Sequence, residues 1–216
     1  GEEQCGGFAE DSNIENFYFF LAGAVFGDGS LAGPGQVRLF FDSRKPRFAE
    51  TVASLSPVQT DIRKQIFSAK KPGFPRSADA FMSYVCRETS IGRILQEKIG
   101  LNKKTKDAER RLPEKVLNGS RREACAFLRG WFSADGSVDF HRTKTRVSLT
   151  SSSVHALREA QILLAKLGIR SCVYDLSHIK TKVGDKEYKR SSVLSIVQSS
   201  AVTRFEELIG FLEERA

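Results

Sequence analysis

Two aspartates, Asp28 and Asp135, follow the same short pattern at two places in this chain of 216 residues. Residues 20–30 read FLAGAVFGDGS and residues 127–137 read FLRGWFSADGS, so the two copies lie about half a chain apart. Paired carboxylates are typical ligands of hard divalent cations, which can activate water and neutralise charge during hydrolysis. The duplication therefore predicts two similar halves, each of which contributes one carboxylate to a shared site.

The residues before each aspartate predict a helix that packs closely against its copy. Gly23 and Gly27 in the first copy, and Gly130 and Ala134 in the second, are spaced four apart and so lie on one helix face. Small residues let two helix backbones approach closely. Helix packing would bring both carboxylates together at helix carboxyl ends, where the dipole disfavours negative charge. We therefore expect a cation to neutralise them.

Both segments resemble the LAGLIDADG motif of homing endonucleases, in the form that carries two motifs in one chain. The first copy, residues 21–29, reads LAGAVFGDG, and the second departs from the motif at Arg129 and at residues 131–133. The resemblance covers nearly the whole chain. It implies a mixed α/β (α+β) fold of two pseudo-symmetric halves in the order αββαββα. Each half would have an antiparallel sheet, and the halves would pack through the two central motif helices.

The domain organisation that follows is a lead-in, two halves and a linker. Residues 1–12 form the lead-in, 13–100 the N-terminal half, 101–119 the linker and 120–216 the C-terminal half. The sequence patterns predict a helix through the first motif and further helices at 47–55, 90–99, 121–134, 153–167 and 202–212. Strands are predicted at 36–42, 61–70, 80–87, 137–141, 146–150, 171–177 and 192–198.

The resemblance implies a site-specific DNA endonuclease that makes metal-dependent double-strand breaks with short 3′ overhangs in a long target. Asp28 and Asp135 would be catalytic and would hold the metal, with the backbone carbonyls of Gly27 and Ala134 as further ligands. The expected cofactor is Mg²⁺, as two or three ions, with Mn²⁺ or Ca²⁺ able to replace it for binding. By analogy a basic catalytic residue follows the last helix of a half. The candidates are Lys104 and then Lys103, with Ser43 and Ser152 as weaker polar candidates.

The charge distribution indicates a polyanionic partner. The chain has a net charge of +8, and residues 61–190 hold 28 basic against 14 acidic residues. A basic surface that only serves solubility remains an alternative explanation. Two sheets side by side would form a groove for double-stranded DNA. The candidate DNA-binding residues lie on its strands and hairpins: Arg38, Asp42, Arg44, Lys70, Arg142, Lys144, Arg146, Ser148, Lys180, Lys182, Lys186, Lys189 and Arg190.

Cysteine spacing and hydropathy indicate an intracellular protein. The four cysteines, Cys5, Cys86, Cys125 and Cys172, are widely separated and suggest neither a zinc site nor a disulfide framework. No apolar run approaches the length of a membrane span, so no membrane partner is expected. Because both motifs lie in one chain, we expect a monomer with pseudo-two-fold symmetry.

Two binding functions compete with cleavage. The first is an RNA maturase that assists intron splicing, and the second is a non-cleaving, sequence-specific DNA-binding protein. A basic scaffold protein would not explain two carboxylates after matching helices. The sequence leaves open whether the chain is encoded by an intron or derives from an intein.

Overall fold

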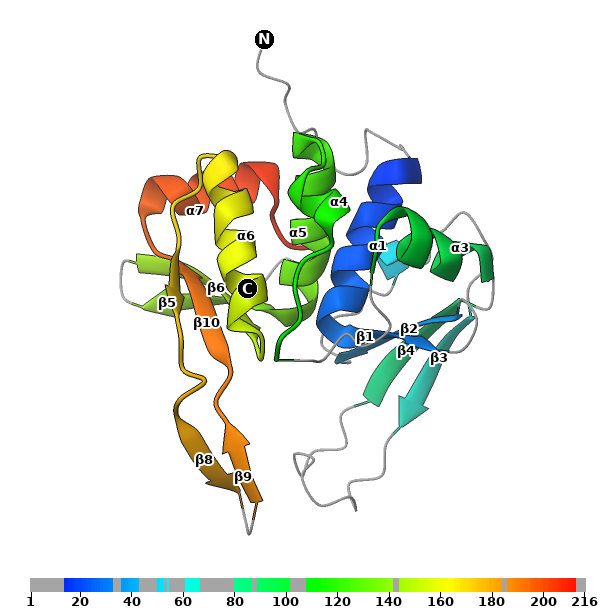
Figure 1. Cartoon of the computed structure of the whole chain (residues 1–216), viewed down its shortest axis with the longest axis horizontal. Coiled ribbons are helices and arrows are strands. Elements are labelled where there is room, and N and C mark those ends of the chain that lie inside the picture. Colours follow the sequence, from blue (N-terminus) through cyan, green and yellow to red (C-terminus); the bar gives the residue numbers. More distant parts are fainter. Residues whose placement is uncertain are drawn as a thin grey trace.

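The computed structural model describes residues 14–32, 36–42, 50–52, 54, 61–66, 80–86, 89–101, 108–141, 144–183 and 186–212. Two helices of 15 residues stand side by side at its centre (Figure 1). These are α1 (Ile14–Asp28) and α5 (Arg121–Asp135), and each ends at the aspartate of its motif. They contact each other more extensively than any other two elements.

Local sequence explains how the two central helices form. A capping box starts α5, in which the side chains of Ser120 and Glu123 each bond the other residue's backbone amide. Helix α1 is buried almost all round, with every residue from Phe19 to Gly27 buried. A helix that is apolar on all sides is stable only inside a core. Both motif helices are therefore held by packing on each other and on the two flanking sheets.

Each motif aspartate is followed at once by the first strand of a four-stranded sheet. Sheet A has the order β1 (Gly29–Ala32), β2 (Gln36–Asp42), β4 (Ala80–Cys86), β3 (Asp61–Ile66). Sheet B has the order β5 (Gly136–His141), β6 (Lys144–Ser151), β10 (Ser192–Ile196), β7 (Cys172–Tyr174). All neighbouring strands are antiparallel. The two orders correspond strand by strand, and the predicted mixed α/β fold with antiparallel sheets is confirmed.

Helices cover one face of sheet B and leave the other face open. Helices α6 (Val154–Lys166) and α7 (Ser199–Leu208) contact β6, and α6 also contacts β10. The strand residues on that side, Val147, Leu149, Leu194 and Ile196, are at most 3% exposed.

In the first half, α3 (Thr89–Arg93) continues into the π-helical turn η1 (Ile94–Lys98). One continuous apolar core joins both halves through the motif helices.

Three features differ from the predicted elements. Strand β1, directly after the first motif, was not predicted. The predicted linker 101–119 contains a helical turn, α4 (Glu114–Leu117), because Pro113 starts it and Val116 packs into the core. The second half exceeds the order αββαββα by a hairpin, β8 (Lys180–Val183) and β9 (Lys186–Lys189). This hairpin extends away from sheet B at the lower end of the view in Figure 1.

Candidate functional site

The two motif helices cross where the small residues lie. A Cβ atom placed on Gly23 would overlap the carbonyl oxygen of Phe127, and one placed on Gly130 would overlap the carbonyl oxygen of Phe20. These two contacts are equivalent under the offset that relates the motifs. The backbones therefore touch directly, and no side chain larger than hydrogen fits at Gly23 or Gly130.

Farther along the helices, the close contact brings the carboxyl ends together. A Cβ atom on Gly27 would lie 2.6 Å from the Cβ of Ala134 and 3.2 Å from Oδ2 of Asp135. The Asp135 carboxylate thus lies against the residue that precedes Asp28. Both aspartates are partly exposed. The sequence prediction placed two carboxylates at one end of a helix pair, and the structure brings their helix ends together.

The two aspartates differ in how their surroundings hold them. Trp131 donates a hydrogen bond from Nε1 to Oδ2 of Asp135 at 3.2 Å. The indole is fully buried and packs edge-on against Phe26, with ring centroids 4.7 Å apart. The motif position of Trp131 is occupied in the first copy by Ala24. Only the second carboxylate, therefore, has an indole donor one helical turn before it.

Arg110, from the segment between the two halves, supplies a cation at this end of the helices. Its Cζ lies 3.6 Å from the centroid of the Phe26 ring, and Nη1 donates to the carbonyl oxygen of Phe26 at 2.5 Å. Burial lowers the pKa of Arg110 from its ordinary value to about 10, and the Asp135 carboxylate acts in the opposite direction. A pKa of about 10 leaves the guanidinium protonated at neutral pH.

The backbone around Arg110 is fixed to the second half. Ser153, the N-cap of α6, donates its hydroxyl to the carbonyl oxygen of Arg110 at 2.5 Å. Glu159 on the same helix accepts the amide of Leu112 at 2.7 Å and pairs with Arg111 at 2.9 Å. Arg110 is therefore anchored on α6 while its side chain contacts α1. Sequence reasoning did not select Arg110, because five basic residues stand between 103 and 111 and spacing alone does not distinguish them.

The donor set of the site fits a hard divalent cation. Two carboxylates and the carbonyl groups at two helix carboxyl ends offer only oxygen atoms, the ligands that Mg²⁺ and Ca²⁺ prefer. Within the described residues, no three His, Cys, Asp or Glu side chains gather as a metal site. Further ligands would therefore have to be backbone oxygens, water or a bound substrate.

The structure describes only one of the other predicted catalytic candidates. Lys103, Lys104 and Ser43 lie outside the described residues, and Ser152 is exposed after β6. Of the predicted DNA-binding residues, Arg44, Lys70 and Arg142 also lie outside them. For Asp42 and Lys186 the structure describes the backbone position, at the end of β2 and the start of β9. The remaining basic residues are all exposed: Arg38, Lys144, Arg146, Lys180, Lys182, Lys189 and Arg190.

Ser148 differs from the other predicted DNA-binding residues in its burial. It lies on the open face of sheet B, as its alternation with Val147 and Leu149 requires, but it is only 5% exposed. Its hydroxyl pairs with that of Ser137 on the adjacent strand at 3.2 Å. A small side chain between larger neighbours is covered by them. Ser148 therefore exposes little surface for a direct DNA contact, and its role in DNA binding stays a prediction.

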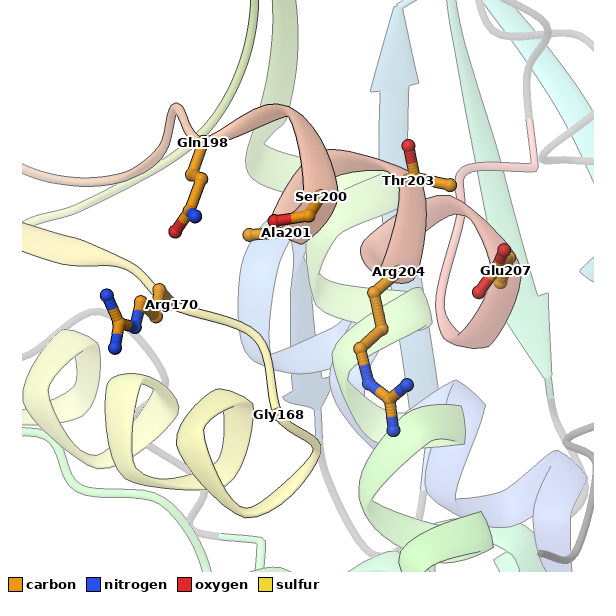
Figure 2. A pocket seen from close by; sticks show the side chains of 8 residues that line it. All are labelled: Gly168, Arg170, Gln198, Ser200, Ala201, Thr203, Arg204 and Glu207. Atoms are coloured by element: carbon orange, nitrogen blue, oxygen red, sulfur yellow. The ribbon is translucent and has the colours of Figure 1, made fainter.

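A separate pocket of about 460 Å³ lies on the helical side of the second half (Figure 2). Arg204 points from α7 toward the end of α6, where its Nε donates to the carbonyl oxygen of Leu167 at 2.7 Å. None of the lining residues belongs to the motif helices or to the predicted site. This pocket is therefore distinct from the candidate active site.

Sequence comparisons identify the class of the second half. Residues 122–210 match the family model of the LAGLIDADG-like domain. The DNA polymerase of Thermococcus sp. (strain GE8) is 31% identical over 112 residues, which are 52% of this chain and 6% of that protein. The tRNA-splicing ligase RtcB of Pyrococcus abyssi is 29% identical over 205 residues, or 88% of this chain and 21% of that protein. The NrdEB subunit alpha of the Bacillus subtilis ribonucleoside-diphosphate reductase is 22% identical over 161 residues, which are 72% of this chain and 15% of that protein. The chain thus spans a minor part of each relative.

Solved structures share the fold over nearly the whole chain. A structure of the homing endonuclease I-DmoI has a TM-score of 0.54 and 16% identity, covering 91% of this chain and 90% of its own. Full-length DUF199/WhiA from Thermatoga maritima has a TM-score of 0.60 and 15% identity, covering 92% of this chain and 56% of its own. Residues 122–210 are therefore similar to a LAGLIDADG-like domain, and the chain shares the fold of these structures over more than nine-tenths of its length.

Proposed function

We propose that this protein is a site-specific DNA endonuclease whose two LAGLIDADG helices form one metal-dependent active site. The observation that carries the proposal is the crossing of α1 and α5, which brings the helix ends of Asp28 and Asp135 into contact through Gly27 and Ala134. Two carboxylates at adjoining helix carboxyl ends repel each other and interact unfavourably with the helix dipoles, and a cation bound between them would relieve both effects. A purely structural helix pair has no need of either aspartate.

In this proposal Asp28 and Asp135 hold the metal, and the carbonyl groups of Gly27 and Ala134 are further ligands. A bound divalent ion would supply an activated water and neutralise charge on the phosphate and the leaving oxygen. Structures of I-DmoI with DNA have been solved with Ca, with Mn and with Mg. We infer that Mg²⁺ is the cofactor here, as two or three ions.

Arg110 is assigned as a positioning residue of this site. Its guanidinium is held against α1 by Phe26 and lies close enough to Asp135 to interact with its charge. Among the described residues, its buried Nε has no hydrogen-bond acceptor. An unsatisfied buried N–H is costly, and a reoriented Asp135 would satisfy it. Lys104 and Lys103 remain candidates for a further basic group.

The partner that fits the charge and shape of the molecule is double-stranded DNA. Both sheets begin at the candidate active site, and exposed basic residues lie on their strands and on the β8–β9 hairpin. Strands and ribbons of this kind can enter the major groove while lysines contact phosphates. We infer that one chain grips one duplex as a pseudo-symmetric monomer, in the intracellular compartment that holds its target.

The relatives support an inserted gene context. This chain resembles small parts of a DNA polymerase, a reductase subunit and a tRNA-splicing ligase, whose named activities differ. Their common part therefore does not serve polymerisation, reduction or ligation. We infer that the shared segment is an insertion carried within host genes, which favours an intein-derived chain over a free-standing one.

RNA maturation and DNA binding without cleavage are the competing functions. The fold occurs both in a homing endonuclease and in WhiA, so the fold alone does not determine activity. Retention of both aspartates at the helix crossing favours cleavage.

A plasmid assay tests the proposal. The substrate carries the uninterrupted host sequence that flanks the gene, and the purified protein is added with Mg²⁺ or with EDTA. Linear product with Mg²⁺ and none with EDTA is expected. Tight specific binding without any cleavage in Mg²⁺ or Mn²⁺ would favour the DNA-binding alternative, and preference for intron RNA would favour the maturase.

A further inference from the structure

The open face of sheet B is neutral along its middle and basic at both ends. The strand register places Asp139 opposite Arg146, Ser137 opposite Ser148, and Val193 between Thr150 and Tyr174. We call the side chains of Thr150, Tyr174, Val193 and Val197, which directly follows β10, the neutral strip. Tyr174 and Val197 are each 53% exposed. The helices that complete the core lie on the opposite face.

The polar groups on this face are mostly occupied within the protein. Arg146 and Asp139 form an ion pair at 2.8 Å, and Ser148 pairs with Ser137. Ser195, next to Ser148 in the register, is only 3% exposed. Apart from this half-exposed ion pair and the exposed Cys172, the accessible groups on β10, β7 and the end of β6 are mainly methyl groups and an aromatic ring.

Basic side chains flank the neutral strip along the strand direction. Lys144 is exposed at the β5–β6 hairpin, and Lys182, Lys189 and Arg190 are exposed on or next to the β8–β9 hairpin at the other end. Seven residues of β6, from Lys144 to Thr150, span about 20 Å at 3.4 Å per residue. That is the length of about six base pairs. Positive ends around a neutral middle match a duplex whose phosphates lie at the edges and whose base edges lie between them.

We propose that the neutral strip reads thymine methyl groups in the major groove of the half-site under sheet B. The thymine C5 methyl is the apolar group among the base edges of the major groove, and apolar side chains recognise it by contact. The inference rests on the proposed DNA-binding function and adds the base class that this half of the molecule selects. It also separates DNA from RNA, because uracil lacks the methyl group.

Replacement of thymine by uracil in the bound duplex tests this directly. The probe is a duplex selected for specific binding from a random pool in Ca²⁺, in which single thymines of each half-site are changed to uracil. The change deletes one methyl group and leaves the hydrogen-bonding pattern intact. We expect two or more thymines under sheet B. Changing any one of them to uracil should lower the affinity for the duplex about threefold to fivefold, the size expected for one buried methyl group.

Protein variants assign the effect to the neutral strip. Val197→Thr and Val193→Thr each keep the shape of the side chain and replace a methyl by a hydroxyl. The uracil penalty is the loss of affinity when one thymine is changed to uracil, and in each variant it should disappear at one thymine. Ile162→Thr on α6 is the matched control, because Ile162 is 54% exposed on the helical side of the sheet. Its uracil penalties should equal those of the unmodified protein.

Specific binding with no thymine enrichment and no uracil penalty in this half-site would overturn the inference and leave the proposed function intact. Uracil penalties that persist unchanged in both valine variants would also overturn it. Absence of any specific duplex binding would overturn the inference and the proposed function together.

Discussion

At the residue scale, the candidate active site is less symmetric than the motifs that form it. Asp135 has the indole of Trp131 as a hydrogen-bond donor and the charge of Arg110 nearby, whereas the first motif has Ala24 in place of the tryptophan. In the proposed cleavage of two DNA strands, the two carboxylates would therefore act in different environments. Single substitutions should reveal which environment serves which strand.

Arg110 gives the sharpest residue-scale prediction. Arg110→Ala should lower the cleavage rate by about tenfold or more, since the site loses a cation near Asp135. Arg110→Lys should retain much of the rate at neutral pH. Lysine begins with a pKa about two units below that of arginine, and the same burial would lower it further.

The pH profile of Arg110→Lys tests that reasoning. Because the protonated form is the active one, cleavage by Arg110→Lys should fall as pH rises from 7 to 9.5, while the unmodified protein keeps its charge up to about pH 10. Arg111→Lys is the control, since Arg111 pairs with Glu159 on the exposed side of the same segment. Identical profiles for both lysine variants would remove Arg110 from the site.

Trp131→Phe should affect one strand more than the other. The change removes the hydrogen bond to Asp135 and keeps an aromatic ring against Phe26. Nicked plasmid should accumulate before linear product, because only one carboxylate loses its donor. A melting curve separates this effect from a packing defect. Equal slowing of both strands would show that the indole does not position Asp135.

At the scale of elements, the crossing of α1 and α5 determines both stability and geometry. The contacts of Gly23 with Phe127 and of Gly130 with Phe20 are backbone contacts, which cannot relax by rotating a side chain. Gly23→Ala and Gly130→Ala should each lower the free energy of unfolding by about 1–3 kcal/mol or more. Both should also slow cleavage, since separation of the helices separates the carboxylates.

Chemical denaturation and cleavage assays on the same preparations test the helix crossing. The two variants should lose similar amounts of stability, because their contacts are related by the pseudo-symmetry. Unchanged stability in both would mean that the helices do not meet at these glycines in solution.

The β8–β9 hairpin is the element whose role is most readily measured with salt. Lys182 and Lys189 are exposed, whereas Lys180 pairs with Glu187 at 2.8 Å. If both free lysines contact phosphates, the double variant Lys182→Ala/Lys189→Ala should reduce the slope of log affinity against log salt by about 1.8. Sequence preference should change little.

Lys115→Ala provides the charge control for the hairpin. Lys115 is exposed on α4, next to the end of α5 that lies away from Asp135. Its removal should leave the salt slope unchanged. Equal slopes for the hairpin variant and the unmodified protein would exclude the hairpin from the DNA contact.

At the scale of the whole molecule, the repeated motif explains how much could be predicted. Two copies half a chain apart imply two similar halves, and the strand orders of sheets A and B agree with that implication. Strand β1 was missed because four residues with two small side chains carry almost no periodicity. Arg110 was missed because its role depends on a stacking contact with Phe26 across 84 residues of sequence. The burial of Ser148 could not be predicted, because alternation predicts the face of a sheet and not how far neighbours cover a small side chain.

The central claim is that Asp28 and Asp135 form one metal site for DNA cleavage, and paired measurements on the variants Asp28→Asn and Asp135→Asn test it most directly. Asparagine keeps the side-chain shape and removes the charge that holds the metal. Each variant should abolish double-strand cleavage of the target plasmid in Mg²⁺ while its affinity for the same DNA stays within about tenfold. Full cleavage by either variant would contradict the account. Loss of binding in both would show that the aspartates support the helix crossing and not the chemistry.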